Sequence, residues 1–164
     1  ETITTILGSC ISACVRDPKV GIGGMNHFML PISNLASPVE TADAARYGNF
    51  AMEQMINDIL RNGGKRENLE IKIFGGGRVM KGVTDVGKKN ISFVKEYIEL
   101  EKLKLLAEDV GGQYPRKVMY HPKTGKVQMK KLINQHNDTV VTRDESYFDK
   151  ITHQENTGGI ELFR

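Results

Sequence analysis

The sequence predicts a single α+β domain, and three of its features carry that prediction. The first thirty residues form short extended segments rich in β-branched residues and glycine, two later segments have apolar residues at helical spacing, and a basic stretch near residue 120 has the pattern of a β-hairpin. The chain has 164 residues, 39% of them apolar, which is enough for one core without disulfides. No repeat or low-complexity tract divides it, so we expect one domain over residues 1–164.

Three strands are expected before residue 31. The segment TITTIL, at residues 2–7, is rich in β-branched residues and is the first. In CISACVRD, at residues 10–17, one alternating face holds Ile11, Ala13 and Val15 and the other holds Cys10, Ser12 and Cys14. Asp17-Pro18 indicates a turn, after which KVGIGGMNHFML returns as a third extended segment that ends at Pro31.

Helix, strand and helix are expected next. Apolar residues recur at helical spacing between Pro38 and Asn62, with Thr41 or Asp43 as the N-cap and Gly63-Gly64 as the stop. LEIKIFGG, at residues 69–76, alternates as a strand, and the glycine-rich segment 75–90 is predicted to be an irregular loop that forms the rim of a site. ISFVKEYIELEKLK, at residues 91–104, predicts a second helix whose apolar face extends to Leu105.

The last expected elements are a hairpin and a polar tail. RKVMYHPKTGKVQMKKL, at residues 116–132, predicts two short strands joined by a turn at Pro122-Lys123-Thr124-Gly125. From Asn134 onward the sequence is polar and weakly patterned, with one short helix expected near Tyr147 to His153. The segment GGIELF near the C terminus could add a strand or act as a docking peptide.

Composition excludes several classes of protein. The formal net charge of +3 is too small for a chain dominated by nucleic-acid binding, and no run of about eighteen apolar residues could span a membrane. No secretory leader pattern is present, and two free thiols fit a reducing compartment, so we expect a cytoplasmic protein. On one strand face, Cys10 and Cys14 would lie about 13 Å apart, too far for a disulfide.

No cofactor or metal ion is expected. The segment FGGGRVMKG lacks the spacing of a phosphate-binding loop, and GIGGMNH does not lead into a helix as a dinucleotide fingerprint requires. The histidines other than His27 are scattered through turn and tail sequence, without ligand spacing.

Cys10 and His27 could be a nucleophile and its base. Cys10 follows Gly8-Ser9, His27 lies seventeen residues later, and both are about eight residues from the turn at Pro18, so the two should meet across adjacent antiparallel strands. A cysteine nucleophile needs such a base together with donors for the oxyanion. Two buried core residues would give the same pattern, because free cysteine is among the most buried residue types. For Cys14 we adopt that core interpretation.

Several motifs in order resemble the CheD family, the chemoreceptor glutamine deamidases of bacterial chemotaxis. The resemblance rests on TTILGSCISACVRDPKVGIGGMNHFMLP, IKIFGGG, VGKKNISFVKEYI and LLAEDVGGQYPRKVMYHPKTGKV. It covers residues 2–132 and leaves residues 133–164 as a C-terminal tail. A series of motifs in this order is much more specific than one cysteine and one histidine.

The resemblance implies a catalytic set. The cysteine of the family matches Cys10 in LGSC, its histidine matches His27 in NHFMLP, and its threonine, six residues before the cysteine, matches Thr4. The Thr4 hydroxyl could bond one imidazole nitrogen and so set the tautomer that faces the thiol. Thr5 would point to the opposite face of the sheet, whereas Thr2 shares the face of Thr4 and is the competing candidate.

The resemblance also implies a fold, a substrate and partners. The fold is a layered sandwich of mostly antiparallel sheets with flanking helices, similar to the catalytic domain of the cytotoxic necrotizing factor toxins. The substrates are specific glutamines, and also glutamyl methyl esters, on the cytoplasmic helices of methyl-accepting chemoreceptors, and the partners include a CheC-type response-regulator phosphatase. The basic stretch from Arg116 to Lys131 is either a solvated hairpin or a contact for such an acidic partner.

Two other functions remain open at this point. The chain could act chiefly as a regulatory binding module for the phosphatase, or as a thiol hydrolase of small amides. An intact Thr4, Cys10 and His27 favours the enzyme over the pure binding module.

Overall fold

A computed structural model describes residues 1–32, 37–79, 85–133 and 143–146. Two sheets form the centre of the molecule. One has the strand order β1 (Ile3–Leu7), β6 (Arg116–His121), β7 (Lys126–Lys131), and the other has β3 (Ile22–Met25), β2 (Ile11–Asp17), β4 (Glu70–Gly75), β5 (Lys104–Val110). Every strand pair is antiparallel except β4 with β5, which is parallel.

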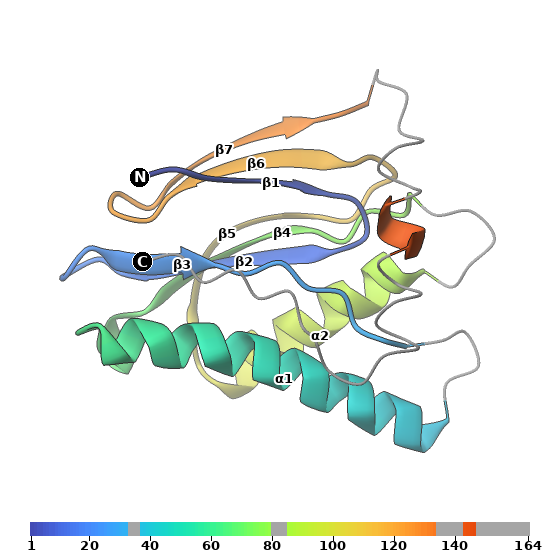
Figure 1. Cartoon of the computed structure of the whole chain (residues 1–164), viewed down its shortest axis with the longest axis horizontal. Helices are drawn as coiled ribbons and strands as arrows, with labels where there is room; N and C mark the ends of the chain where they lie inside the picture. Colours follow the sequence, from blue (N-terminus) through green and yellow to red (C-terminus); the bar gives the residue numbers. More distant parts are fainter. Residues whose placement is uncertain (33–36, 80–84, 134–142, 147–164) are drawn as a thin grey trace.

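The elements stack in three layers (Figure 1). The three-stranded sheet covers one face of the four-stranded sheet, and helices α1 (Pro38–Arg61) and α2 (Val86–Leu100) cover the other face. A single turn of 3₁₀ helix, η1 (Arg66–Asn68), precedes β4. The predicted α+β class, with mostly antiparallel sheets and flanking helices, is therefore confirmed.

The two faces of β2 take part in two separate cores. Ile11, Ala13 and Val15 pack with apolar residues of α1, α2 and β4. Cys10 and Cys14 pack instead with residues of β1 and β6, such as Leu7, Val118 and Tyr120. Both cysteines are free thiols, as predicted, and both are buried. The alternation read from the sequence thus decides which side chains lie between the two sheets, and Cys10 is one of them.

Helix α1 has the predicted extent but a different N-cap. The side chain of Ser37 accepts a hydrogen bond from the Glu40 N–H, and the Glu40 carboxylate accepts one from the Ser37 N–H. This capping box makes Ser37 the N-cap and Pro38 the first helical residue, so the expectation of a cap at Thr41 or Asp43 was wrong. After the helix ends, Gly63 has a φ of +106°, a conformation that glycine adopts without strain.

The segment around α2 differs most from the prediction. The helix begins at Val86, capped by the Asp85 side chain, so residues 86–90 are helical rather than part of an irregular loop. Gly87 allows α2 to approach the segment after β4 closely, because a Cβ atom on it would lie 2.4 Å from the carbonyl oxygen of Gly76. The helix ends at Leu100, and Leu105 belongs to β5, a strand missed because most of its residues are exposed and do not alternate.

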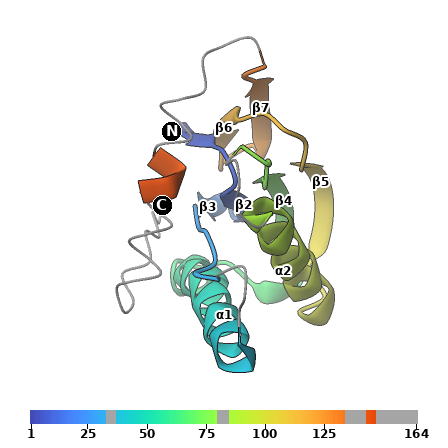
Figure 2. The same cartoon turned by 90° about the vertical axis from the view of Figure 1, so that its right-hand side faces the viewer.

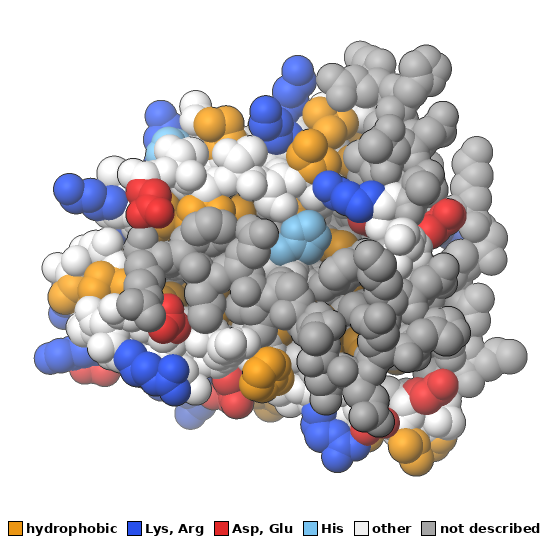
Figure 3. Space-filling model, in the orientation of Figure 1, with side chains coloured by type: hydrophobic (Ala, Val, Ile, Leu, Met, Phe, Trp, Pro, Cys, Tyr) orange, Lys and Arg blue, Asp and Glu red, His pale blue; other side chains and the backbone are white. Residues whose placement is uncertain are grey.

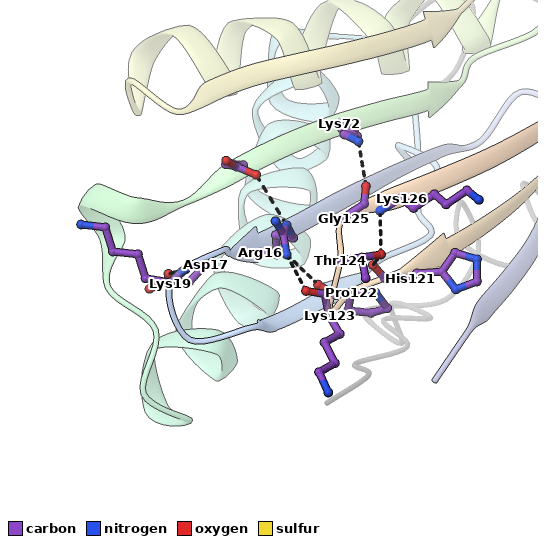
Figure 4. A network of polar contacts seen from close by, with 11 residues as sticks. Arg16, Asp17, Lys19, Lys72, His121, Pro122, Lys123, Thr124, Gly125 and Lys126 are labelled. Atoms are coloured by element: carbon purple, nitrogen blue, oxygen red, sulfur yellow. Dashed lines mark hydrogen bonds and ion pairs between the residues drawn. The ribbon is translucent and has the colours of Figure 1, made fainter.

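The predicted hairpin is confirmed, and its turn is bound to the second sheet (Figure 4). The Arg16 guanidinium of β2 donates to the carbonyl oxygen of Lys123 at 2.7 Å, and the Lys72 ammonium of β4 donates to that of Gly125 at 2.7 Å. These bonds join the two sheets at one end of the sandwich, and the β1–β2 connection lies at the opposite end (Figure 1).

Two expectations for the tail lie outside the described residues, namely the short helix near Tyr147 to His153 and the role of GGIELF. Beyond Ile133, the described part of the tail is one helical turn, residues 143–146, which the sequence did not predict. It lies beside the edge strands β1 and β3 rather than between the sheets (Figure 2). Within the described residues, neither long helix is apolar over enough of its length to cross a membrane.

Candidate active site

Cys10 lies in the connection between β1 and β2, where glycine amides hold the backbone. The carbonyl oxygen of Cys10 accepts a hydrogen bond from the Gly76 N–H at 2.8 Å, and that of Gly8 accepts one from the Gly77 N–H at 2.9 Å. Gly75 has a φ of +110°, and a Cβ atom on it would lie 2.1 Å from the Cys10 carbonyl oxygen. The glycine-rich segment after β4 is therefore required for the close approach of its backbone to the Cys10 connection.

Strand register brings His27 to the same face as Cys10. Cys14 pairs with Met25, and the pairing of Ile11 with Phe28 continues the same register, so Cys10 lies opposite Met29. His27 is two residues from Met29 and is thus the diagonal neighbour of Cys10. Diagonal neighbours have Cα atoms about 7–8 Å apart, within reach of an imidazole side chain. The sequence predicted that Cys10 and His27 lie directly opposite each other. In the structure the strand register is shifted by two residues, which leaves both side chains on the same face.

Asn90 of α2 joins the two segments that carry this pair. Its side-chain NH₂ group donates to the carbonyl oxygen of Ser9 at 2.9 Å, and its Oδ1 accepts from the Leu30 N–H at 2.9 Å. Asn90 is fully buried. One amide side chain therefore fixes the residue before Cys10 relative to the segment after His27. Sequence reasoning missed Asn90 because the helix was expected to begin at Ile91, after it.

Thr5, not Thr4, contacts the histidine. Thr5 Oγ1 lies 3.0 Å from His27 Nδ1. Along β1, Thr5 shares a face with the buried residues Ile3 and Leu7, whereas Thr4 is exposed. The expectation that Thr5 points away from the site was wrong, because Ile3 and Leu7 define the inner face and alternation puts Thr5 on it. Any catalytic role of Thr4 stays a prediction from the family resemblance.

Burial keeps the Cys10 thiol and the His27 imidazole neutral. Desolvation and, second, the positive charge of Arg143 lower the pKa of His27 to about 4. Desolvation and, second, the Asp144 carboxylate raise the pKa of the Cys10 thiol well above its ordinary value, and Arg143 partly opposes this. At neutral pH the resting pair is consequently a thiol and an uncharged imidazole, not a thiolate and an imidazolium.

The turn at residues 143–146 supplies two charged groups that the sequence did not single out. The Asp144 side chain accepts hydrogen bonds from the N–H of Ser9 at 2.7 Å and from its hydroxyl at 3.0 Å. The Arg143 guanidinium donates to the carbonyl oxygen of Ile6 at 2.7 Å. Nothing in the sequence could have indicated these contacts, because they span about 135 residues from a weakly patterned tail.

Arg116, predicted to be part of a basic surface, is fully buried. Its guanidinium donates to Asp109 Oδ1 at 2.8 Å and to the carbonyl oxygen of Gly111 at 2.7 Å. Five lysines of the predicted stretch remain exposed: Lys117, Lys123, Lys126, Lys130 and Lys131. Basic side chains stand out along the edge of the molecule over β6 and β7 (Figure 3). Within this basic stretch, the side chains available to an acidic partner are therefore those of the five lysines.

Comparison with known proteins identifies relatives over nearly the whole chain. A family model described as CheD chemotactic sensory transduction matches residues 29–131. A protein of Hahella chejuensis named probable chemoreceptor glutamine deamidase CheD is 55% identical over 164 residues, covering 99% of this chain and 78% of that protein. Proteins of the same name from Halorhodospira halophila and Methylobacillus flagellatus are 54% and 51% identical, over 99% and 98% of this chain and 77% and 81% of their own lengths. The chain therefore belongs to the CheD family of chemotactic sensory transduction proteins.

Proposed function

We propose that this chain deamidates specific glutamine side chains of methyl-accepting chemoreceptors, with Cys10 as the nucleophile and His27 as the general base. The observation that carries the mechanism is the placement of Cys10 and His27 as diagonal neighbours on one sheet face. The Thr5 contact at His27 Nδ1 supports it further. The relatives named as probable chemoreceptor glutamine deamidases support the substrate. We expect the reaction to take place in the cytoplasm, where free thiols persist.

In the first half of the reaction, the neutral imidazole accepts the proton of the Cys10 thiol as the sulfur attacks the carboxamide carbon of glutamine. The S–C bond forms, and the electron pair of the C=O bond moves onto the oxygen. The intermediate then collapses, the C–N bond breaks, and His27 gives its proton to the leaving nitrogen. Ammonia departs, and a thioester joins Cys10 to the substrate.

In the second half, the same ring activates water. His27 takes one proton from a water molecule as its oxygen attacks the thioester carbon, the C–S bond breaks, and the proton returns to the sulfur of Cys10. Glutamate leaves and the resting thiol is restored. A glutamyl methyl ester would pass through the same thioester with methanol as the leaving group, so we propose that this ester is hydrolysed as well.

The neutral resting pair supports general-base catalysis. A histidine with a pKa of about 4 remains unprotonated at neutral pH and can accept a proton. Because the pKa of the buried thiol is raised, proton transfer must accompany the attack on the carbonyl carbon rather than precede it. Before proton transfer to His27, the buried thiol is therefore a weak nucleophile.

A second candidate function is regulatory binding of a CheC-type phosphatase with little catalysis. The exposed lysines of β6, β7 and their turn favour a partner with an acidic surface. Receptor helices that bear glutamates would fit the same surface, so binding alone does not separate the two functions.

Ammonia release and a one-dalton mass gain on receptor cytoplasmic fragments would separate them. We expect the gain with the wild-type protein and its loss with Cys10→Ala. Cys14→Ala is the matched control, because Cys14 is an equally buried thiol in the same core as Cys10. This variant should leave turnover within about twofold. Wild-type turnover by Cys10→Ala would disprove the mechanism. No gain on any receptor, with retained binding of the phosphatase, would establish the second function instead.

A further inference from the structure

A buried carboxylate occupies the two hydrogen-bond donors next to the candidate nucleophile. Asp144 Oδ2 lies 2.7 Å from the Ser9 nitrogen and 3.0 Å from the Ser9 hydroxyl, and the Asp144 side chain is 2% exposed. The approach depends on Gly8, because a Cβ atom there would lie 2.1 Å from the same carboxylate oxygen. The residue before Cys10 thus directs two donors at one oxygen atom.

The Cys10 connection does not need Asp144 to keep its shape. The carbonyl oxygens of Gly8, Ser9 and Cys10 already accept hydrogen bonds from other residues. The donors are Gly77 and Gly76 in the segment after β4, and Asn90 in α2. Asp144 belongs instead to a separate turn beside the edge strands, held to β1 by the Arg143 bond to the Ile6 carbonyl oxygen (Figures 1 and 2). Its bonds to Ser9 are therefore additional to those that hold the backbone.

The charge of Asp144 opposes the chemistry of Cys10. A carboxylate beside the thiol disfavours negative charge on the sulfur, and Asp144 is the second-largest contribution, after burial, to the raised pKa of Cys10. Arg143 counters it, with its guanidinium 3.9 Å from Asp144. A residue that assisted the attack would not add a negative charge at this position.

An amide hydrolase needs donors at this position for a different oxygen. When the sulfur attacks a carboxamide, negative charge develops on the substrate oxygen, and donors placed beside the nucleophile stabilise it. An N–H and a hydroxyl on the residue preceding the cysteine are suited to that role. The product of deamidation is a carboxylate, the same chemical group that Asp144 presents to Ser9.

We propose that the N–H and hydroxyl of Ser9 are the donors for the side-chain oxygen of the substrate, and that Asp144 occupies them as an internal, product-like competitor. The proposal rests on the proposed deamidase function, which it deepens by naming the oxygen site and its resting occupant. A glutamine side chain must displace Asp144 before it reaches Cys10, so the C-terminal turn lowers activity until a receptor binds.

Substitution of Asp144 combined with added acetate tests the proposal. In Asp144→Ala, the KM for a receptor fragment should fall about tenfold with kcat little changed, because the competitor for two hydrogen bonds is gone. Acetate, a small carboxylate, should then inhibit the variant competitively and affect the wild-type protein much less. Glu145→Ala removes an exposed carboxylate of the same turn and is the matched control, expected to behave like the wild type.

Changes opposite to these, in the kinetic constants and in the response to acetate, would overturn the proposal. If Asp144→Ala lowers kcat/KM and acetate restores it, the carboxylate is an anchor that positions Ser9. An unchanged KM without inhibition by acetate would also overturn it. If the alanine variant unfolds, Asp144→Asn, which keeps the side-chain shape, replaces it in the same measurements. Its KM should fall less, because a neutral amide oxygen is a weaker acceptor than a carboxylate.

A readout without receptor separates this proposal from the deamidase proposal. Alkylation of Cys10 by iodoacetamide at neutral pH should be about tenfold faster in Asp144→Ala, since a like charge beside the thiol is removed, and acetate should slow it again. If alkylation changes in this way but no receptor is deamidated, the proposal that Asp144 occupies the Ser9 donors is supported and the proposed deamidase function is contradicted. Deamidation by the wild type together with an unchanged alkylation rate in Asp144→Ala would contradict only the proposal that Asp144 occupies the Ser9 donors. The proposed deamidase function would be unaffected.

Discussion

Thr5 Oγ1 lies 3.0 Å from His27 Nδ1, across the space between the two sheets. With the imidazole neutral, an Nδ1–H donated to this hydroxyl leaves Nε2 as the proton-accepting nitrogen of the ring. The proposed role of His27 as the base for the Cys10 thiol requires this tautomer, which the contact with Thr5 accommodates. It comes from the threonine that alternation places with Ile3 and Leu7, next in sequence to the one that the family resemblance implies.

Two valine substitutions separate the two threonines. Thr5→Val removes the hydroxyl at nearly constant shape and should lower kcat about ten- to hundredfold with little change in KM, because His27 loses the bond that orients it. Thr4→Val, at an exposed position of the same strand, should stay within about twofold of the wild type. The measurement is steady-state deamidation of a receptor fragment. A large loss with Thr4→Val and none with Thr5→Val would support the residue implied by the resemblance.

Unfolding free energy should depend on pH through His27. The pKa of His27 is about 4 in the folded protein and 6.5 ordinarily, so between these values the unfolded chain binds more protons. Stability should therefore fall as the pH drops from 6.5 to 4, by up to about 3 kcal/mol, and this loss should level off below pH 4. Urea unfolding across this range checks it, with His27→Gln as the reference.

The difference between the two proteins isolates this contribution. Asp144 also titrates abnormally, since burial raises its pKa despite the two opposing bonds from Ser9, but both proteins contain it. Parallel stability curves for the wild type and His27→Gln between pH 6.5 and 4 would contradict a His27 whose pKa is lowered in the folded protein.

Gly75→Ala should destabilise the protein by at least about 3 kcal/mol, since it combines a positive φ with a collision against the Cys10 carbonyl oxygen. Gly111→Ala is the matched control. It has a φ of +86°, but the nearest heavy atom to an added Cβ lies at 4.0 Å, so it should cost only about 1–2 kcal/mol. Equal losses in denaturant unfolding would show that the Cys10 connection tolerates displacement.

Local sequence pattern determined most of the elements and the two faces of β2. Alternation along residues 10–17 separated Ile11, Ala13 and Val15 from the cysteines, and the structure keeps that division between its two cores. The turn at Pro122 to Gly125 was likewise readable from its residue types. The exposed strand β5 was not, because strand formation there depends on pairing with β4 rather than on a pattern of its own.

For the candidate site, the sequence alone selected Cys10 and His27, because their chemistry and their spacing about a turn are local properties of one hairpin. Tertiary structure decided their surroundings: that Thr5 orients the ring, that Asn90 joins the two segments, and that Asp144 binds Ser9. These three contacts link residues 22, 81 and 135 positions apart. Periodicity and turn chemistry act over a few residues, whereas such contacts exist only after the sheets and helices have packed.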